Sequence, residues 1–329
     1  MKSSKTYATI GLTSPLAVAA GVISGPGGAV LLGERTAPHS LAGWWEFPGG
    51  KIAAGETHHQ ALRRELQEEL GITLHASRPL MTFDAPGPRP VRIHLREVLA
   101  HDGTPAGREG QKLAWVERDA LATWPLLPAD RPALAALTLP PRYAITPATP
   151  EAAAAALLSA LQEGRVAGEM MIQIRLPGLA EPALGDFLAP FAAPLNAAGI
   201  PWLVNTDPEH ALALGASGVH LTAARLKATR RDVVAGWRAA RPGWRVAASC
   251  HDAAEVAQAA ACDVDFICLG PLRTTSSHPG RRPLGWDGLA ALAIGAPLAV
   301  YALGGIGFDD FDQAREAGAA GIAGIRGFW

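Results

Sequence analysis

The stretch GKIAAGETHHQALRRELQEELGI, from Gly50 to Ile72, decides the fold of the first part of this chain. Thr57, followed three residues later by Gln60, forms a capping box, the pattern that opens an α-helix. Gly71 is the residue type that commonly ends a helix, because glycine adopts the left-handed conformation without strain. We therefore predict a helix over residues 57–70.

The predicted helix carries three acidic side chains on one face, spaced i, i+3 and i+4: Glu65, Glu68 and Glu69. A neighbouring stripe of leucines at 62, 66 and 70 would dock the helix on a core. Three glutamates alone could be a solvated acidic face, because like charges at this spacing repel. Clustered carboxylates also suit Mg2+ or Mn2+, and such an ion would lower the pKa of an attacking water.

Short apolar runs predict strands on both sides of this helix. The first two enclose the turn GPGG and are interpreted as a hairpin. The predicted strands are residues 16–23, 29–32, 80–83, 91–99 and 112–116, and a short helix is predicted over residues 131–137.

The chain changes character after the proline-rich stretch TLPPRYAITPATP, residues 138–150, which we interpret as a domain junction. Eight apolar runs then alternate with alanine-rich helical stretches, a pattern that predicts a (β/α)8 barrel, with a doubly wound open sheet as the alternative. The predicted strands are residues 143–145, 170–174, 201–204, 218–221, 245–248, 266–269, 298–301 and 321–325.

The barrel is expected to lack its last helix, because the sequence ends at Trp329, just after the eighth strand. The barrel surface that this helix would cover then needs another cover. We expect the N-terminal domain or a second copy of the chain to pack there.

Composition limits the classes of partner. Hydrophobic residues make up 49% of the 329 residues and the net charge is -1, so the chain has a core but no basic field that would attract duplex nucleic acid. A small charged metabolite is the expected partner. Three cysteines without a CxxC pair favour a reducing cytoplasm. The apolar stretch near the N-terminus is interrupted at residues 13–15 and is interpreted as a strand rather than a signal peptide. No apolar run is long enough to span a membrane.

The first part resembles the Nudix hydrolases. Gly50, Glu56 and RELQEELGI (residues 64–72) match the Nudix box, and WEFPGGKIAAGET (residues 45–57) is similar to the MutT branch, which clears 8-oxo-dGTP. The resemblance covers residues 1–137 and implies a Nudix α/β/α sandwich fold. It also implies Mg2+ or Mn2+ ligands at the Gly49 carbonyl, Glu65, Glu68, Glu69 and Glu109.

The resemblance also implies roles for further residues. Glu109, in REGQ, would be a general base or an extra ligand beside the catalytic Glu65 and Glu68, and Arg64 would orient a glutamate through a charge-assisted bond. The nucleotide-binding residues that it implies are Arg35, His39, Glu46, Phe47, Pro48, Lys51 and Asp130. Lys51 and Arg35 would hold phosphate oxygens. The expected reaction is attack of water on the triphosphate chain, releasing pyrophosphate.

Asp130 departs from the MutT pattern, in which an asparagine in a Pro-Ala-Asn context reads the oxidised base. An amide both donates and accepts hydrogen bonds, whereas an ionised carboxylate only accepts. Base preference is therefore open, and we expect Asp130→Asn to change discrimination between 8-oxo-dGTP and dGTP more than turnover.

The second part, residues 142–329, resembles thiamine phosphate synthase and its TenI relatives. The motifs that carry the likeness are QIR (173–175), VNT (204–206), GVHL (218–221), SCH (249–251), GP (270–271) and ALGGI (302–306). Most of them follow a predicted strand, at the end where barrel enzymes place their sites. The likeness implies that a phosphorylated thiazole-like or pyrimidine ligand is bound by Gln173, Arg175, Asn205, Thr274, Thr275, Gly304 and Gly305.

The catalytic pattern of that family is incomplete here. Leu176 and Pro177 stand where the synthases have a lysine, Thr206 stands where they have an aspartate, and TAAR (222–225) replaces an acidic metal ligand. Pro271 occupies the place of the TenI histidine, for which His251 or His278 could substitute. An active synthase, a different enzyme and a non-catalytic binding or structural module all remain open, and we favour the last.

The prediction is a cytoplasmic protein of two α/β domains joined by a linker at residues 138–141. The N-terminal domain is expected to hydrolyse oxidised purine nucleoside triphosphates, or otherwise another nucleoside diphosphate derivative. The alternative for the whole chain is a bifunctional thiamine-pathway enzyme whose Nudix domain acts on a thiamine-related pyrophosphate.

Overall fold

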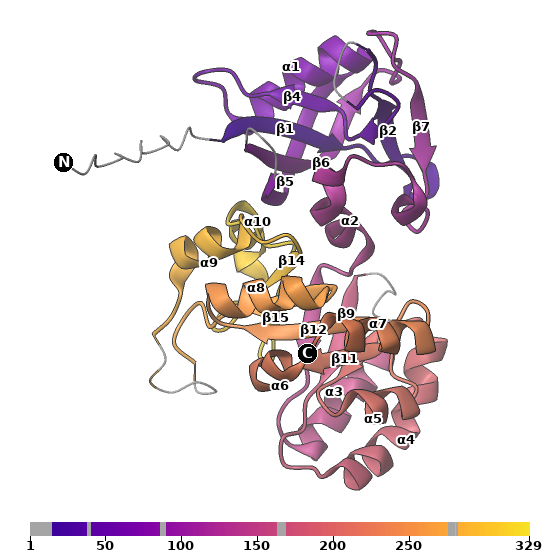
Figure 1. The fold of residues 1–329 in the computed structure, drawn as a ribbon, viewed down its shortest axis with the longest axis vertical. Helices are drawn as coiled ribbons and strands as arrows, with labels where there is room; N and C mark the ends of the chain where they lie inside the picture. The colour runs from indigo at the N-terminus through magenta and orange to yellow at the C-terminus, as the bar shows by residue number, and fades with distance from the viewer. Residues whose placement is uncertain (1–14, 38–40, 86–89, 163–168, 276–279, 281) are drawn as a thin grey trace, which may run out of the picture.

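The computed structural model describes residues 15–37, 41–85, 90–162, 169–275, 280 and 282–329. Figure 1 shows an N-terminal domain and a barrel, with one helix, α2, between them. Among the described residues, no helix combines the length and the apolarity needed to cross a bilayer.

The N-terminal domain is built on two sheets. Its four-stranded mixed sheet has the order β4-β1-β6-β5, and its three-stranded antiparallel sheet has the order β3-β2-β7. The strands are β1 (Leu16–Val22), β2 (Val30–Glu34), β3 (Trp45–Glu46), β4 (Gly49–Lys51), β5 (Thr73–Ala85), β6 (Val91–Asp102) and β7 (Leu113–Val116), and the helices are α1 (His58–Leu70) and α2 (Arg131–Thr138).

The predicted hairpin of the first two strands is wrong. β1 lies between β4 and β6, so both of its hydrogen-bonding edges are occupied, and β2 belongs to the other sheet. Across the turn, the two segments are joined by an isolated bridge between Ser24 and Val30 and by two bonds, from the Gly25 amide to the Ala29 carbonyl and from the Leu31 amide to the Ile23 carbonyl.

The C-terminal domain is a closed barrel of eight parallel strands, as the alternation of apolar runs predicts. Its strands are β8 (Arg142–Ile145), β9 (Met170–Ile174), β10 (Trp202–Val204), β11 (Gly218–Leu221), β12 (Arg245–Cys250), β13 (Phe266–Leu269), β14 (Ala299–Leu303) and β15 (Gly321–Gly324). Its helices are α3 (Pro150–Gln162), α4 (Glu181–Ala197), α5 (Pro208–Ala213), α6 (Ala223–Ala228), α7 (Arg231–Ala240), α8 (Ala253–Cys262), α9 (Gly285–Ala293) and α10 (Phe311–Glu316). No helix follows β15 among the described residues, as expected.

The barrel interior is filled with aromatic side chains rather than open. Tyr143, Phe266 and Tyr301 are buried and in mutual contact, with ring centroids of Phe266 and Tyr301 4.9 Å apart. A single apolar cluster runs from these rings to Met81 and Phe83 of β5. The N-terminal domain therefore closes the end of the barrel at which the strands begin.

Polar contacts join the two domains at the same end. The Asp84 amide donates to the Ile294 carbonyl at 2.7 Å, and the buried Arg315 of α10 bonds to the Pro79 carbonyl of β5 at 3.4 Å. The Tyr301 hydroxyl donates to the Pro140 carbonyl, and Leu139 and Pro140 of the predicted linker are buried at the interface. The opposite end of the barrel, where the strands finish, lies away from these contacts.

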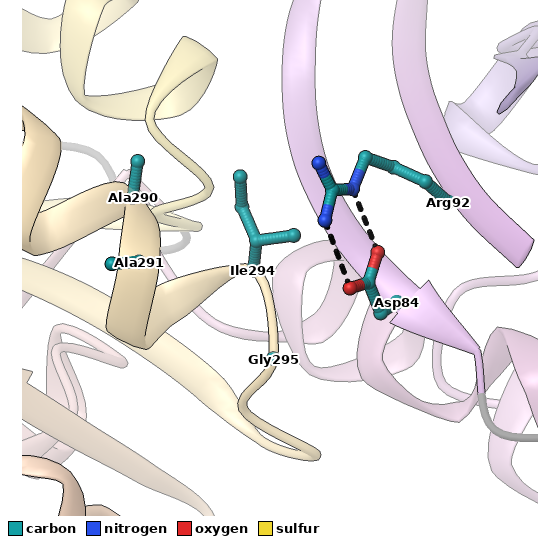
Figure 2. A pocket seen from close by; sticks show the side chains of 6 residues that line it. All are labelled: Asp84, Arg92, Ala290, Ala291, Ile294 and Gly295. Atoms are coloured by element: carbon teal, nitrogen blue, oxygen red, sulfur yellow. Dashed lines mark hydrogen bonds and ion pairs between the residues drawn. The ribbon is translucent and has the colours of Figure 1, made fainter. Parts of the chain in front are cut away.

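A crevice of about 300 Å3 lies between the domains, as Figure 2 shows, and is lined by Asp84, Arg92, Ala290, Ala291, Ile294 and Gly295. Arg92 donates two hydrogen bonds, of 2.8 and 3.0 Å, to the Asp84 carboxylate. The crevice therefore presents a neutralised ion pair beside an apolar wall.

Candidate active site

Helix α1 is positioned by the signals that its sequence contains. The Thr57 side chain accepts from the Gln60 amide, Gln60 bonds back to the Thr57 amide at 2.8 Å, and Gly71 ends the helix with φ 72°. The helix buries Ala61 and its leucine stripe against β1 and β5. Its glutamate face consequently has a fixed orientation beside β4.

Two glycines bring the backbone of β4 against these glutamates. The Gly49 amide donates to Glu69 Oε2 at 3.1 Å. A Cβ on Gly50 would lie 2.4 Å from the carboxyl carbon of Glu65, and one on Gly49 would lie 2.2 Å from the Ala19 carbonyl oxygen. Only glycine permits this approach, so the GG pair is a condition for the site geometry.

Arg64 links the glutamates to the loop before the helix. Its guanidinium holds Glu56 with two bonds of 2.9 Å, Glu65 at 2.8 Å and the Lys51 carbonyl at 2.9 Å. The Arg64 bonds hold the pKa of Glu56 near 2. The predicted orienting contact from Arg64 to a glutamate is thus present in the structure.

Glu69 is the most perturbed carboxylate of the group. Burial raises its pKa to about 8, against the opposing bond from the Gly49 amide, and the neighbouring charges of Glu65 and Glu109 add to the shift. A bound divalent cation would oppose this shift, because its charge favours the ionised form of a carboxyl group.

The loop that carries Glu109 is tied to the end of α1. The Arg108 amide and the Gln111 side chain both donate to the Glu69 carbonyl, at 2.9 and 3.0 Å. The Glu109 amide donates to Gln111 Oε1 at 2.8 Å, and the Glu109 side chain is exposed. The fold therefore brings residue 109 to the glutamate face across 40 residues of sequence.

The carboxylate oxygens are the kind of ligand that a hard divalent cation prefers, but they do not converge on one point in this structure. Within the described part of the chain, no three acidic, histidine or cysteine side chains converge as metal ligands. Glu68 is 56% exposed and lies 3.5 Å from Arg64. The ligand set of Gly49, Glu65, Glu68, Glu69 and Glu109 stays a prediction.

The predicted nucleotide-binding residues surround β3. Arg35 pairs with Glu46 at 2.7 Å, and Phe47 is buried in the core. Pro48 is buried and its carbonyl accepts from the Gly21 amide, whereas the Lys51 side chain is exposed. His39 lies outside the described residues.

Asp130 is carried to the same place by a pairing that is distant in sequence. The Trp45 amide donates to the Pro125 carbonyl and the Leu127 amide to the Trp45 carbonyl, at 3.0 and 2.9 Å. This sets the turn that holds Asp130 beside β3. Burial raises the pKa of Asp130 to about 8; Glu46 raises it further, and Arg35 opposes the shift.

The residues predicted to bind a ligand in the barrel lie at or just past the strand ends. Gln173 is buried, the Arg175 amide donates to Thr146 Oγ1 at 2.9 Å, and the Asn205 side chain donates to the His220 carbonyl at 2.9 Å. Thr274 is exposed, and Thr275 Oγ1 is buried without a partner among the described residues.

The glycine pair after β14 has an unforeseen neighbour. Gly304 and Gly305 both have positive φ, 106° and 72°. Arg273, from the loop after β13, bonds to the Gly305 carbonyl and to both oxygens of Asp310, at 2.7 to 3.1 Å. Sequence reasoning missed this pair, and the only signal was a basic residue beside the predicted phosphate loop.

Other charged residues at this end of the barrel are paired as well. Arg225, in the segment that replaces an acidic ligand, binds Asp207 at 3.0 Å. His251 Nδ1 lies 2.8 Å from Glu255 Oε2, and the Glu255 side chain is 8% exposed. His278 lies outside the described residues. The barrel end thus offers ion pairs in place of the missing carboxylates.

Comparisons with known proteins divide the chain at the same place. The NUDIX domain model matches residues 14–137, and the thiamine monophosphate synthase model matches residues 142–328. The chain therefore belongs to the Nudix family through its N-terminal domain, which is related to the MutT-type 8-oxo-dGTP diphosphatases, and to the thiamine monophosphate synthase family through its barrel.

Three relatives illustrate the likeness. An 8-oxo-dGTP diphosphatase of Haemophilus influenzae is 41% identical over 115 residues, which cover 34% of this chain and 84% of that protein. A CTP pyrophosphohydrolase of Escherichia coli is 38% identical over 110 residues, 33% of this chain and 82% of that protein. A putative thiamine-phosphate synthase of Geobacter sulfurreducens is 33% identical over 151 residues, 45% of this chain and 68% of that protein.

Proposed function

We propose that the N-terminal domain hydrolyses 8-oxo-dGTP to 8-oxo-dGMP and pyrophosphate with the help of Mg2+ or Mn2+, which would remove oxidised purines from the nucleotide pool before replication. The observation that carries the proposal is the Gly49–Glu69 contact, at a carboxyl group whose pKa is raised by burial and by the neighbouring charges of Glu65 and Glu109. The likeness to an 8-oxo-dGTP diphosphatase supports the substrate.

The chain's own residues would divide the work as follows. The Gly49 carbonyl and the glutamate face would hold the divalent cation, which when bound neutralises phosphate oxygens and acidifies the attacking water. Glu109 would take the proton of the water as its oxygen bonds to phosphorus and the bond to pyrophosphate breaks. Arg64 would keep Glu65 in place, and Lys51 would hold a phosphate oxygen.

The base is the less constrained part of the proposal. One relative is named for CTP, and Asp130 replaces the asparagine that the MutT resemblance implies. A purine remains our choice because the first relative is named for an oxidised purine nucleotide and matches the chain with the higher identity.

For the barrel we propose a binding role, for a phosphorylated thiazole-like or pyrimidine ligand, without synthase chemistry. The ion pairs of Arg225 and Arg273 with aspartates at the strand ends support the absence of synthase chemistry. The family likeness and the positive φ of Gly304 and Gly305 support a phosphate-binding role. A thermal shift assay with thiamine phosphate tests the binding role: a rise in melting temperature supports it, and no shift with any thiamine or pyrimidine phosphate contradicts it.

The test of the hydrolase compares kcat/KM for 8-oxo-dGTP, dGTP, CTP and thiamine pyrophosphate. We expect the highest value for 8-oxo-dGTP. Glu69→Gln should lower it about 10^3-fold, whereas Glu117→Gln, the same change at an exposed residue after β7, should have no effect. A preference for CTP or thiamine pyrophosphate would overturn the substrate, and an active Glu69→Gln variant would overturn the site.

A further inference from the structure

Asp130 is a buried carboxyl group without the partners that a buried charge requires. Its side chain belongs to a residue that is 5% exposed, and its Oδ2 atom has no hydrogen-bond partner among the described residues. An ionised carboxylate in such a position would cost several kcal/mol, roughly, unless it were paired.

The charged groups that face Asp130 do not supply that pairing. Glu46, on the adjacent β3, repels a second negative charge. Arg35 is the nearby cation, but its guanidinium is already engaged by Glu46 at 2.7 Å. Arg35 Nε is also buried without a partner in the described part of the chain, so the nearby cation does not pair with Asp130 in this structure.

The neutral form of the carboxyl group resolves the conflict. Burial and Glu46 both favour the protonated state, and the pKa of about 8 keeps the proton in place at neutral pH. A protonated carboxyl presents one O–H donor and one C=O acceptor, which is the hydrogen-bonding pattern of an amide.

We propose that Asp130 meets the base as a neutral carboxylic acid, whose O–H donates to a ring carbonyl and whose C=O accepts from the adjacent ring N–H. This inference rests on the proposed function and specifies how the site selects its substrate class. The buried position beside β3 and the partnerless Oδ2 atom are the observations behind it.

Oxidised purines present this pair of groups. The edge of guanine in question carries two acceptors, O6 and N7. Oxidation at C8 places a proton on N7, so the same edge then carries an acceptor beside a donor. The neutral acid pairs with both groups of the oxidised base. With guanine, the C=O of the acid would instead face N7, which is also an acceptor. An unmatched buried group of this kind corresponds to a preference on the order of 10- to 100-fold.

Deprotonation would remove the donor to O6, because the ionised form has two acceptors. Both bases carry O6, so the affinity for both nucleotides should fall as pH rises past about 8, whereas the preference for the oxidised base, which depends on N7, should persist. Asp130→Asn keeps a donor and an acceptor at every pH, so its affinity should not follow that transition.

The experiment measures Kd for 8-oxo-dGMP and dGMP by calorimetry between pH 6 and pH 9.5. It uses the full chain, Asp130→Asn, and Asp119→Asn as a control at an exposed residue. The oxidised base has an acidic proton of its own, which titrates equally in all three proteins. We expect the Kd of each nucleotide to rise about tenfold or more across pH 8 in the wild type and the control only.

The outcomes separate this inference from the proposed function. Preference for 8-oxo-dGMP, with affinities that follow the same pH course in wild type and Asp130→Asn, overturns the neutral acid and leaves the hydrolase proposal standing. Equal affinity for the two nucleotides at every pH, together with no hydrolysis of 8-oxo-dGTP, overturns both.

Discussion

The glutamate face of α1 and the end of the barrel at which the strands finish differ in how their charged groups are paired. At α1, Glu69 lies among other carboxylates, and its pKa is raised to about 8. At the barrel end, Arg225 and Arg273 have aspartate partners at 3.0 and 2.7 Å. The two regions therefore differ in their pairing: Glu69 keeps acidic neighbours that raise its pKa, whereas each of the two arginines at the barrel end is matched by an aspartate.

The packing of the two domains reinforces the contrast. The barrel is closed at one end by the apolar cluster that includes Met81 and Phe83. The residues predicted to bind a ligand lie at the other end. The predicted packing over the missing eighth helix, by this domain or by a second copy, stays a proposal. The interface shows instead that the Nudix domain packs against the end of the barrel at which the strands begin.

After Glu69→Gln, the largest effect is expected at Arg64. Arg64→Ala removes its bonds to Glu56, Glu65 and the Lys51 carbonyl, so Glu65 loses its orientation. Because residues that orient metal ligands commonly contribute 10- to 100-fold, kcat should fall by about that factor. The measurement is steady-state hydrolysis of 8-oxo-dGTP at saturating Mg2+.

Arg63→Ala is the matched control, because Arg63 is the exposed neighbour on the same helix. Equal losses in both variants would mean that general charge, rather than the orientation of Glu65, accounts for the effect.

A smaller effect is expected in the pH dependence of stability. The pKa of Asp130 is about 8 in the fold and near 4 in an unfolded chain, so between these values the folded state binds more protons. Its contribution is complete below pH 4 and is lost as pH rises towards 8. Asp130→Asn should flatten the decline by up to about 1.4 kcal/mol per pH unit.

Urea unfolding of the metal-free protein at several pH values between 5 and 8 measures this slope. A slope in Asp130→Asn as steep as in the wild type would show that Asp130 is already ionised in the folded protein. Asp119→Asn, at an exposed position, should leave the slope unchanged.

The smallest effect is expected at the barrel. Arg273→Ala breaks the pair with Asp310, far from the glutamate face, and should change kcat/KM for 8-oxo-dGTP by less than about twofold. A larger loss in a protein with an unchanged melting temperature would show that the barrel end acts on the hydrolase and that the two regions are not independent.

Local signals made much of the fold predictable. The capping box at Thr57 and the glycine at position 71 gave α1 within one residue, and the alternation of apolar runs gave all eight barrel strands. The hairpin prediction failed because strand pairing is decided by which edges are free, and β4 and β6 occupy both edges of β1. A local pattern does not contain that information.

The site was predictable in part for the same reason. The glutamates share one helix, so their spacing was visible in the sequence. The burial of Asp130 was not visible, because it depends on the pairing of Trp45 with residues 125 and 127. The pairing of Arg273 with Asp310 likewise arises only when the loops after β13 and β14 meet.

The central claim is that one domain catalyses and the other does not. It is tested most directly by assaying one preparation of the full chain for Mg2+-dependent hydrolysis of 8-oxo-dGTP and for formation of thiamine phosphate. We predict hydrolysis that Glu69→Gln abolishes, and no thiamine phosphate above background. Thiamine phosphate formation that persists in Glu69→Gln would contradict the account.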